Sequence, residues 1–432
     1  MSRNLFLFGG VAVLFLLTGL MASWNQSLYI LNISLVFALM SLGVNMQWGY
    51  AGLFNTGVMG FAALGGLAVA LTAAPPVAAA WQAGGLGVLG GLILGAAILG
   101  LAVVLYRRMA PGRSRTLALL VVLIGGFFLF RAVFDPAVTA VEAINPSVSG
   151  NLGGLGLPLL FAWPLGGLLA AAAAWAIGKT ALGLRSDYLA IATLGIAEIV
   201  VAVMKNEDWL ARGVKMVNLS ERPWPVPFEV DLQRTAWFTD MAANWGFDPV
   251  TGSSIFVKLC YTALIAVVLV SIVFLSERAL NSPWGRMMRA IRDNEISAAA
   301  MGKDVTRRHL HVFILGSAVI GVAGAIFVSM DGILNPGTYQ PLRFTFLIWV
   351  MVIVGGSGNN WGAVLGALLI GWLYLIVEQV GPNIMGAITA GLPEGALKAH
   401  LVDSAQHMRL LTLGVILLLV LRFSPRGLLP EK

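Results

Sequence analysis

The sequence predicts an all-α, polytopic integral membrane helical bundle with about 10–12 membrane segments and both termini in the cytoplasm. Hydrophobic residues occupy 58% of the 432 positions and charged residues only 11%, and the mean hydropathy is +0.87. Such a composition is typical of a chain that is surrounded mostly by lipid. A net charge of +7 that is spread this thinly does not indicate nucleic-acid binding. We expect a single transmembrane domain over residues 1–432.

Apolar windows that are long enough to cross a bilayer recur along the whole chain. A helix needs about 20 apolar residues to span the hydrocarbon core. The first window is expected to be an uncleaved helix, because a second one begins at Leu28. The windows at 344–356 and 408–423 are short, so each is expected to be tilted, broken or re-entrant. The expected spans are 5–22, 28–48, 51–74, 84–106, 116–134, 158–178, 188–204, 255–275, 310–330, 344–356, 359–380 and 408–423.

The distribution of charge predicts the orientation of these spans. Lys and Arg collect in the cytoplasmic loops of membrane proteins. If the N-terminus is inside, the inner segments hold most of the Lys and Arg and few acids. The longest outer segment, 205–254, is rich in Pro, Trp and charge and is expected to form an external cap. The predicted inner segments are 1–4, 107–115, 179–187, 276–309 and 422–432.

A polar stretch lies at the start of the third apolar window. It reads "NMQWGYAGLFNTG" and places Asn45, Gln47, Asn55 and Thr56 beside several glycines. This composition suits a discontinuous helix, because freed backbone groups are tolerated at membrane depth only beside protein or water. We therefore interpret these four residues as candidates for a translocation pathway. A kinked helix that only packs against its neighbours would explain the same pattern.

Glu198 is the one acidic residue that lies well inside a predicted span, in "YLAIATLGIAEIVVAVM". A carboxylate at mid-membrane costs about 2.5–3.5 kcal/mol on insertion scales. It is therefore expected to face the bundle interior or a watery path and to have a partner. Two roles stay open for Glu198, a group in the translocation pathway and a buried hydrogen bond that ties helices together.

The densest charge of the chain lies in the inner segment 276–309, which includes "RAIRDNEISAAAMGKDVTRR". Ser282 and Pro283 predict an N-cap and a first helical residue for a helix that runs to about Arg292. Asn294 is expected to cap a second, two-turn helix that ends at Gly302.

The second helix has one small apolar face, formed by Ile296, Ala299 and Ala300. Because so short a helix is marginal in water, the face predicts a docking partner. The alternative is a solvated loop near anionic lipid, a description that fits "YRRMAPGRSR" at 106–115 better.

No stretch of the sequence predicts an enzyme, a metal site or a nucleotide site. The four histidines lack metal-ligand spacing, and the single cysteine, Cys260, lies in an apolar run. The glycines of 85–90 lie inside an apolar helix rather than between a strand and a helix, where a nucleotide fingerprint would belong. ATP that drives this protein would have to bind to another chain.

Several motifs together resemble those of a known family. They are "NMQWGYAGLFNTG", "LRSDYLAIATLGIAEI", "GRMMRAIRDNEISAAAMGKDVTRRHLHVFILGSAVIGVAGAIF", "VGGSGNNWGAVLGALL" and "RFSPRGLLP". They resemble the branched-chain amino-acid permeases of the LivM type, within the hydrophobic amino-acid uptake importers. The resemblance runs in order over most of the chain.

The resemblance implies the partners, the location and the function of the chain. Such permeases lie in the bacterial inner membrane, pair with a second homologous permease, dock two cytoplasmic ATPases that hold ATP and Mg²⁺, and receive solute from a periplasmic binding protein. This chain itself is then expected to bind membrane lipid but no cofactor. Glu198 matches the acid of the family's inner-helix motif, and the segment 289–302 matches its coupling helix. The implied ATPase-coupling residues are Arg289, Arg292, Asp293, Glu295, Ala299 and Gly302.

Two departures from the family pattern keep the identity of the solute open. A Gly- and Pro-rich turn is replaced by "LARGVKMVNLSERP", and the stretch 84–134 holds more apolar sequence than a minimal member needs. The expected solute is Leu, Ile or Val, and urea or short amides are the alternative. An ion-coupled secondary transporter is the second alternative, although Glu198 is nearly the only intramembrane acid that such a protein could use.

Overall fold

The computed structural model describes residues 2–145, 150–219, 224–391, 393 and 395–431. Within them, each predicted window contains a helix. The helices of these windows are α1 (Ser2–Met21), α2 (Trp24–Val44), α3 (Val58–Ala73), α5 (Leu86–Arg108), α6 (Arg113–Glu142), α7 (Leu159–Ala181), α8 (Ser186–Asn206), α12 (Pro249–Leu280), α15 (Val305–Asp331), α16 (Leu347–Gly355), α17 (Asn360–Ile388) and α19 (Met408–Phe423).

Shorter elements connect these helices. The short α-helices are α4 (Ala78–Ala80), α9 (Asp208–Ala211), α10 (Glu229–Arg234), α11 (Ala236–Asn244), α13 (Pro283–Asp293), α14 (Glu295–Ala300) and α18 (Ala396–Asp403). The π-helical turns are η1 (Asn45–Gly49), η2 (Trp81–Gly85) and η5 (Leu342–Phe346), and the 3₁₀ turns are η3 (Gly213–Lys215), η4 (Pro336–Thr338) and η6 (Ser404–His407). Two strands, β1 (Val217–Asn218) and β2 (Ile333–Leu334), pair antiparallel.

The architecture confirms a polytopic helical membrane protein. In the described part of the chain, nine helices are long and apolar enough to cross a membrane, and α18 with α19, bent by 63°, would make a tenth span. The apolar helices α3 and η5–α16 are shorter than a full crossing. The short length predicted for 344–356 is therefore confirmed. The window 51–74 differs from its prediction, because helix α3 begins only at Val58.

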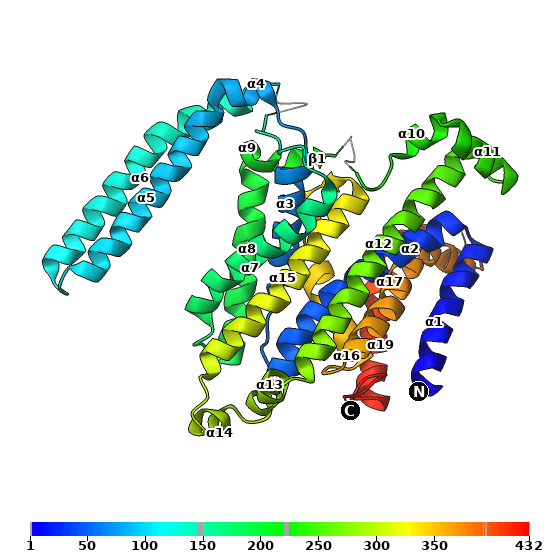
Figure 1. Ribbon diagram of the computed structural model, residues 1–432. Helices are drawn as coiled ribbons and strands as arrows, with labels where there is room; N and C mark the ends of the chain where they lie inside the picture. Colours follow the sequence, from blue (N-terminus) through cyan, green and yellow to red (C-terminus); the bar gives the residue numbers. More distant parts are fainter. Residues whose placement is uncertain (1, 146–149, 220–223, 392, 394, 432) are drawn as a thin grey trace.

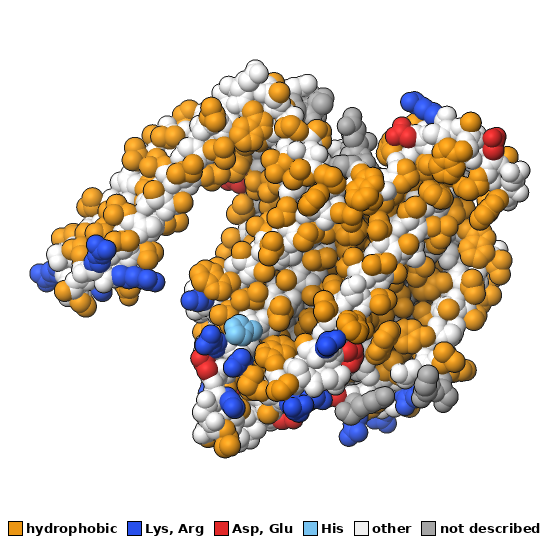
Figure 2. Space-filling model, viewed as in Figure 1, with side chains coloured by type: hydrophobic (Ala, Val, Ile, Leu, Met, Phe, Trp, Pro, Cys, Tyr) orange, Lys and Arg blue, Asp and Glu red, His pale blue; other side chains and the backbone are white. Residues whose placement is uncertain are grey.

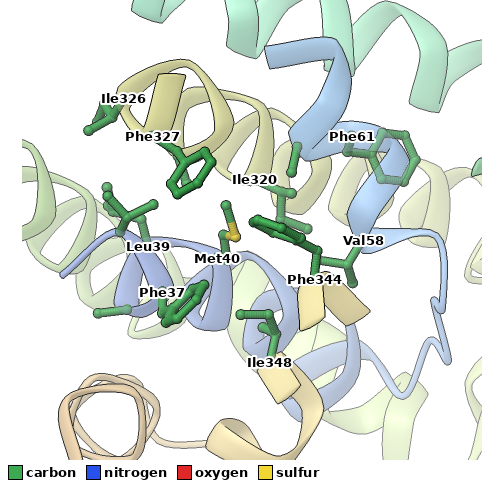
Figure 3. Packing of buried hydrophobic residues seen from close by; sticks show 14 of the residues in the cluster. Phe37, Leu39, Met40, Val58, Phe61, Ile320, Ile326, Phe327, Phe344 and Ile348 are labelled. Carbon is green, nitrogen blue, oxygen red and sulfur yellow. The ribbon is translucent and has the colours of Figure 1, made fainter. Parts of the chain in front are cut away.

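The core lies around α15, which packs against α7, α3 and α2. Figure 3 shows its aromatic and aliphatic side chains, with Phe37 and Met40 of α2 facing Phe327 of α15 and Phe344 of η5. Backbones approach closely where glycines meet, since a Cβ added to Gly65 of α3 would lie 1.9 Å from the carbonyl oxygen of Gly321 in α15. Small residues allow such approaches between membrane helices.

Helices α5 and α6 form a hairpin that projects from the bundle (Figure 1). The hairpin contacts the rest of the molecule at the end opposite its α5–α6 turn. There Phe134 packs edge-on against Trp209 of α9, with ring centroids 5.5 Å apart. The Glu142 carboxylate also accepts a hydrogen bond from the backbone N–H of Trp209 at 3.2 Å. Most of the remaining hairpin surface is exposed in this chain.

Both termini lie on the same side of the molecule as α13 and α14 (Figure 1). Many of the Lys and Arg side chains in Figure 2 gather on this side and at the tip of the hairpin. Because basic residues mark the cytoplasmic side of membrane proteins, we treat this side as the inner one.

The predicted outer segment, 205–254, contains α9, η3, β1, α10, α11 and the start of α12. Its residues 220–223 lie outside the described ones. β1 joins this segment to the loop after α15, with Val217 opposite Leu334. The assignment of 205–254 as an external cap and of 276–309 as the inner coupling loop stays a prediction.

Candidate functional site

The candidate site begins at a break between α2 and α3. The chain passes from α2 through the π-turn η1 and then runs without helix from Gly52 to Gly57, so that α3 starts inside the bundle. Gly52 has φ +70°, and the Arg292 side chain packs beside it. A left-handed φ favours glycine, which explains the choice of residue at this bend.

Three amides in the break are fully buried. The Asn45 amide donates to Oδ1 of Asn360 at 3.2 Å, and its own oxygen accepts from the backbone N–H of Gly358 at 2.9 Å. Asn55 donates to Oε1 of Gln47 at 2.8 Å. Because buried polar groups cost free energy unless they are paired, these bonds hold the break in place. The amides of Asn45, Gln47 and Asn55 thus find partners within this chain.

Gln47 connects the break to α15. Its amide nitrogen donates to the Phe313 carbonyl at 2.9 Å and lies 3.0 Å from the Ser317 hydroxyl. The loop from Gly52 to Gly57 is therefore attached to the central helix of the core.

The short continuous helix η5–α16 lies against this break. The Thr345 hydroxyl donates to the Thr56 carbonyl at 3.1 Å, and the Trp349 indole N–H donates to the Asn55 carbonyl at 3.1 Å. Two of the carbonyls that the broken helix frees are thus bonded to protein, as a membrane interior requires. Discontinuous helices occur in transporters at their solute sites.

Thr56 contacts helix α8 and Glu198 belongs to it, but the structure does not bring the two side chains together. The Thr56 hydroxyl donates to the Ala190 carbonyl of α8 at 2.5 Å. Ala197 of α8 is buried against Gly60 of α3. Glu198 is the next residue and is exposed, and its carboxylate makes no hydrogen bond or ion pair with the residues that the structure describes. Glu198 therefore faces out of this chain.

The helices predicted in the inner loop form as expected. Asn294 caps α14, because its side chain accepts from the backbone N–H of Ser297 at 2.9 Å. Gly302 follows α14 with φ +75°. Ser282 precedes α13 and Pro283 begins it, but the Ser282 hydroxyl donates to the Ala279 carbonyl at 2.6 Å and makes no cap bond. Ser282 is thus the N-cap residue and Pro283 the first helical residue, as predicted, and the Ser282 hydroxyl bonds to the end of α12 rather than to a backbone N–H of α13.

Arg292 joins the inner loop to the break. Its Nη1 donates to the Gly49 carbonyl at 2.5 Å and to Oε2 of Glu431 at 2.9 Å, and its Nε lies 3.1 Å from Oδ1 of Asp293. Burial opposes the charge, but the bonds to Glu431 and Asp293 raise the pKa of Arg292, so the guanidinium stays charged. The Arg292 side chain is only 24% exposed. It is held inward, toward the end of η1.

The other predicted coupling residues differ in their exposure. Arg289 is partly buried, with Nη2 3.4 Å from the Leu280 carbonyl. The others are exposed on the inner side, and they are Asp293, Glu295, Ala299 and Gly302.

Helix α14 and its C-cap residue each expose one large apolar side chain. Ile296 is 84% exposed and Met301 is 79% exposed. An exposed apolar patch beside charged residues is typical of a protein–protein contact. We name Ile296 and Met301 the apolar tip.

Comparison with known families matches residues 124–421 to the family described as "Branched-chain amino acid transport system / permease component". This range covers more than half of the chain. The chain belongs to this permease family.

Individual relatives agree with the family. The branched-chain amino acid permease protein LivM of Escherichia coli is 31% identical over 62% of this chain. The matched region covers 56% of the length of the Escherichia coli protein. A LivM protein of Methanocaldococcus jannaschii is 25% identical over 92% of this chain and 91% of its own length. The fructose import permease FrcC of Rhizobium meliloti is 29% identical over 28% of this chain. No solved structure matches the chain.

The permease-family match contains only part of the candidate site. It includes Glu198, the inner helices α13 and α14, and the α16–α17 segment. Helix α5, the start of α6 and the break at 45–57 lie before it.

Sequence reasoning missed three features of this site. The Arg292–Glu431 pair and the contacts of Thr345 and Trp349 join segments that are far apart in sequence, and no local pattern signals them. Met301 carried a usable signal, since it is a large apolar residue directly before the predicted end of a short helix in a polar loop.

Proposed function

We propose that this chain is the membrane-spanning permease subunit of an ATP-binding-cassette importer for Leu, Ile or Val or a related small solute. Membership of the permease family and the printed names of the LivM relatives support the class of transporter. The observation that carries the proposal is the Arg292 bond to Gly49, which connects an exposed inner loop to a broken membrane segment. A loop that receives force from an ATPase needs such a connection to reach the pathway.

The partners and the location form part of the same proposal. Two cytoplasmic ATPase subunits would hold ATP and Mg²⁺ and would dock on the inner loop, and a periplasmic binding protein would deliver the solute to the outer side. A second homologous permease would complete the pathway in the bacterial inner membrane. This chain would act as a transporter subunit and not as an enzyme.

The coupling route would follow the contacts already described. Closure of the ATPases on ATP would displace α14 and the adjoining end of α13. Arg292 would pass this movement to Gly49 at the end of η1. The break from Gly52 to Gly57 could then change its angle while Gln47 stays attached to α15. Asn55 and Thr56 would form the moving part of the pathway wall, and Asn45 and Gln47 would form its fixed part.

Glu198 would contribute from the outward face of α8. An unpaired carboxylate at membrane depth is costly against lipid, so the second permease is expected to cover this face. In the resulting interface Glu198 could meet the ammonium group of an amino acid. A urea or amide carrier would have no such cation to bind.

Glu198→Gln tests this role. A hydrogen bond to a charged group contributes about 1.5–3 kcal/mol, so uptake of leucine at low concentration is expected to fall roughly 10- to 100-fold. The measurement is initial uptake into proteoliposomes that contain the whole transporter. Asp187→Asn, an exposed acid at the inner end of the same helix, serves as the control and is expected to stay within about twofold of wild type. Equal effects of both variants would contradict the role of Glu198.

Gly302→Val tests the geometry of α14. A β-branched residue is disfavoured at a left-handed φ by about 1–2 kcal/mol, and open space around Gly302 excludes a steric effect on the bundle. Uptake per ATP hydrolysed is expected to fall several-fold, while the amount of folded protein in detergent is unchanged. Gly302→Ala should have a smaller effect because it lacks the β-branch. Normal coupling in the Val variant would contradict a mechanical role for this turn.

The proposed function as a whole is tested by reconstitution with the proposed partners, which are the two ATPases, the second permease and the binding protein. ATP inside the vesicles is expected to drive uptake of labelled leucine without any ion gradient. Accumulation of urea but not of leucine would support the alternative solute. Uptake that needs an ion gradient and no ATP would establish a secondary transporter instead.

A further inference from the structure

A long apolar groove runs between α5 and α6 in the hairpin. Its volume is about 510 Å³, and its lining includes Leu92, Leu99, Leu123 and Phe130. Gly95 is part of this lining and keeps it open, because a Cβ added there would approach the Phe130 ring to 3.2 Å. The groove is elongated along two helices and wholly lined by apolar residues, so it fits a hydrocarbon chain.

A cluster of arginines lies at the inner turn of the same hairpin. Arg107 and Arg108 are in the last turn of α5, and Arg113 and Arg115 are in the first turn of α6. This first turn of α6 has no acidic residue. None of the four has a carboxylate partner among the described residues. Arg115 lies over the Tyr106 ring, 4.7 Å from its centroid. Positive charges at a helix N-terminus are unfavourable, so an anion would relieve this cluster.

The groove and the cluster have the spacing of one lipid molecule. Leu99 precedes Arg107 by two turns, which is about 12 Å along the helix. The cluster is at the tip of the hairpin, on the inner side (Figure 2), where anionic headgroups attract basic residues. Helix α5 and the first part of α6 lie outside the permease-family match.

We propose that the hairpin binds an anionic glycerophospholipid of the inner leaflet. The arginines of the turn would contact the phosphate of its headgroup, and one acyl chain would occupy the groove. Free phosphate would fill only the charged part of this site, and a zwitterionic lipid would bring a cationic group close to the arginines together with its phosphate. The inference is independent of the solute that the protein carries.

The test is native mass spectrometry of the full chain in detergent, titrated with dioleoyl phosphatidylglycerol or dioleoyl phosphatidylcholine. Wild type is expected to bind phosphatidylglycerol at least tenfold more tightly than phosphatidylcholine. Arg113→Gln with Arg115→Gln should weaken phosphatidylglycerol binding at least tenfold. The matched control is Arg307→Gln with Arg308→Gln, which removes two arginines from the first turn of α15, also on the inner side.

A second pair of variants separates the groove from the charge. Gly95→Leu fills the groove and is expected to weaken phosphatidylglycerol binding at least fivefold with all arginines in place. Gly100→Leu is its control, because no other atom lies within 4 Å of a Cβ at that exposed position. Equal losses in the two arginine pairs, or no loss with Gly95→Leu, would overturn the proposal. So would a cross-link from Gly95→Cys to a helix of another subunit in the assembled transporter.

Discussion

Arg292→Gln is expected to lower ATP-driven uptake by at least about 100-fold while the ATPase subunits stay bound and hydrolyse ATP. The substitution removes the bonds to the Gly49 carbonyl and to Glu431. A hydrogen bond to a charged group contributes about 1.5–3 kcal/mol. Because Arg292 is partly exposed, the lower end applies to each bond. Together they give about 3 kcal/mol, or roughly 100-fold. The measurement is the ratio of leucine transported to ATP hydrolysed.

Two further variants make this test specific. Glu431→Gln weakens the ion pair but leaves the bond to Gly49, so an intermediate loss of roughly tenfold is expected. Combining it with Arg292→Gln should add little, since both changes act on one contact. Arg286→Gln removes an exposed arginine from α13 and is the charge-matched control. If Arg292→Gln transports leucine at the normal ratio, the route through Gly49 is wrong.

The features that the sequence could predict are local ones. The apolar windows follow from the length that a helix needs to cross a membrane, and each contains a helix in the structure, although the window 51–74 is helical only from Val58 onward. Asn294 and Gly302 were predictable because caps and left-handed turns depend on a few neighbouring residues. The polar stretch from Asn45 to Thr56 signalled the break for the same reason, since its amides and glycines disfavour a continuous apolar helix.

The features that the sequence could not predict depend on distant segments. Arg292 looked like one charge among many in a cytoplasmic loop, and its contacts with Gly49 and Glu431 exist only after three parts of the chain have packed together. The exposure of Glu198 depends on which face of α8 packs against α3. The sequence also could not predict that the α5–α6 hairpin projects from the bundle, because a helix that faces lipid has the same apolar composition as a helix that faces protein.

Ile296→Glu is expected to weaken binding of the ATPase subunits by more than about 100-fold. Ile296 and Met301 are the most exposed apolar side chains of the inner loop, at 84% and 79%. Burying an isoleucine side chain contributes about 1.5–3 kcal/mol, and a buried, unpaired carboxylate would add a further penalty. The measurement is the dissociation constant between the permease in nanodiscs and the purified ATPase. Ile296→Ala should remove only the apolar contact, so the affinity for the ATPase is expected to fall roughly tenfold.

The matched control for the charge is Thr306→Glu, which places the same carboxylate on an exposed residue in the first turn of α15. Both changes add one negative charge to the inner loop, so a contact centred on the apolar tip should tolerate Glu at 306 far better than at 296. Equal losses would mean that only the net charge of the loop matters. Full binding by Ile296→Glu would place the docking contact elsewhere. An apolar centre rimmed by Asp293 and Glu295 has the anatomy of a protein interface, and a lipid-binding loop would instead need basic residues at those positions.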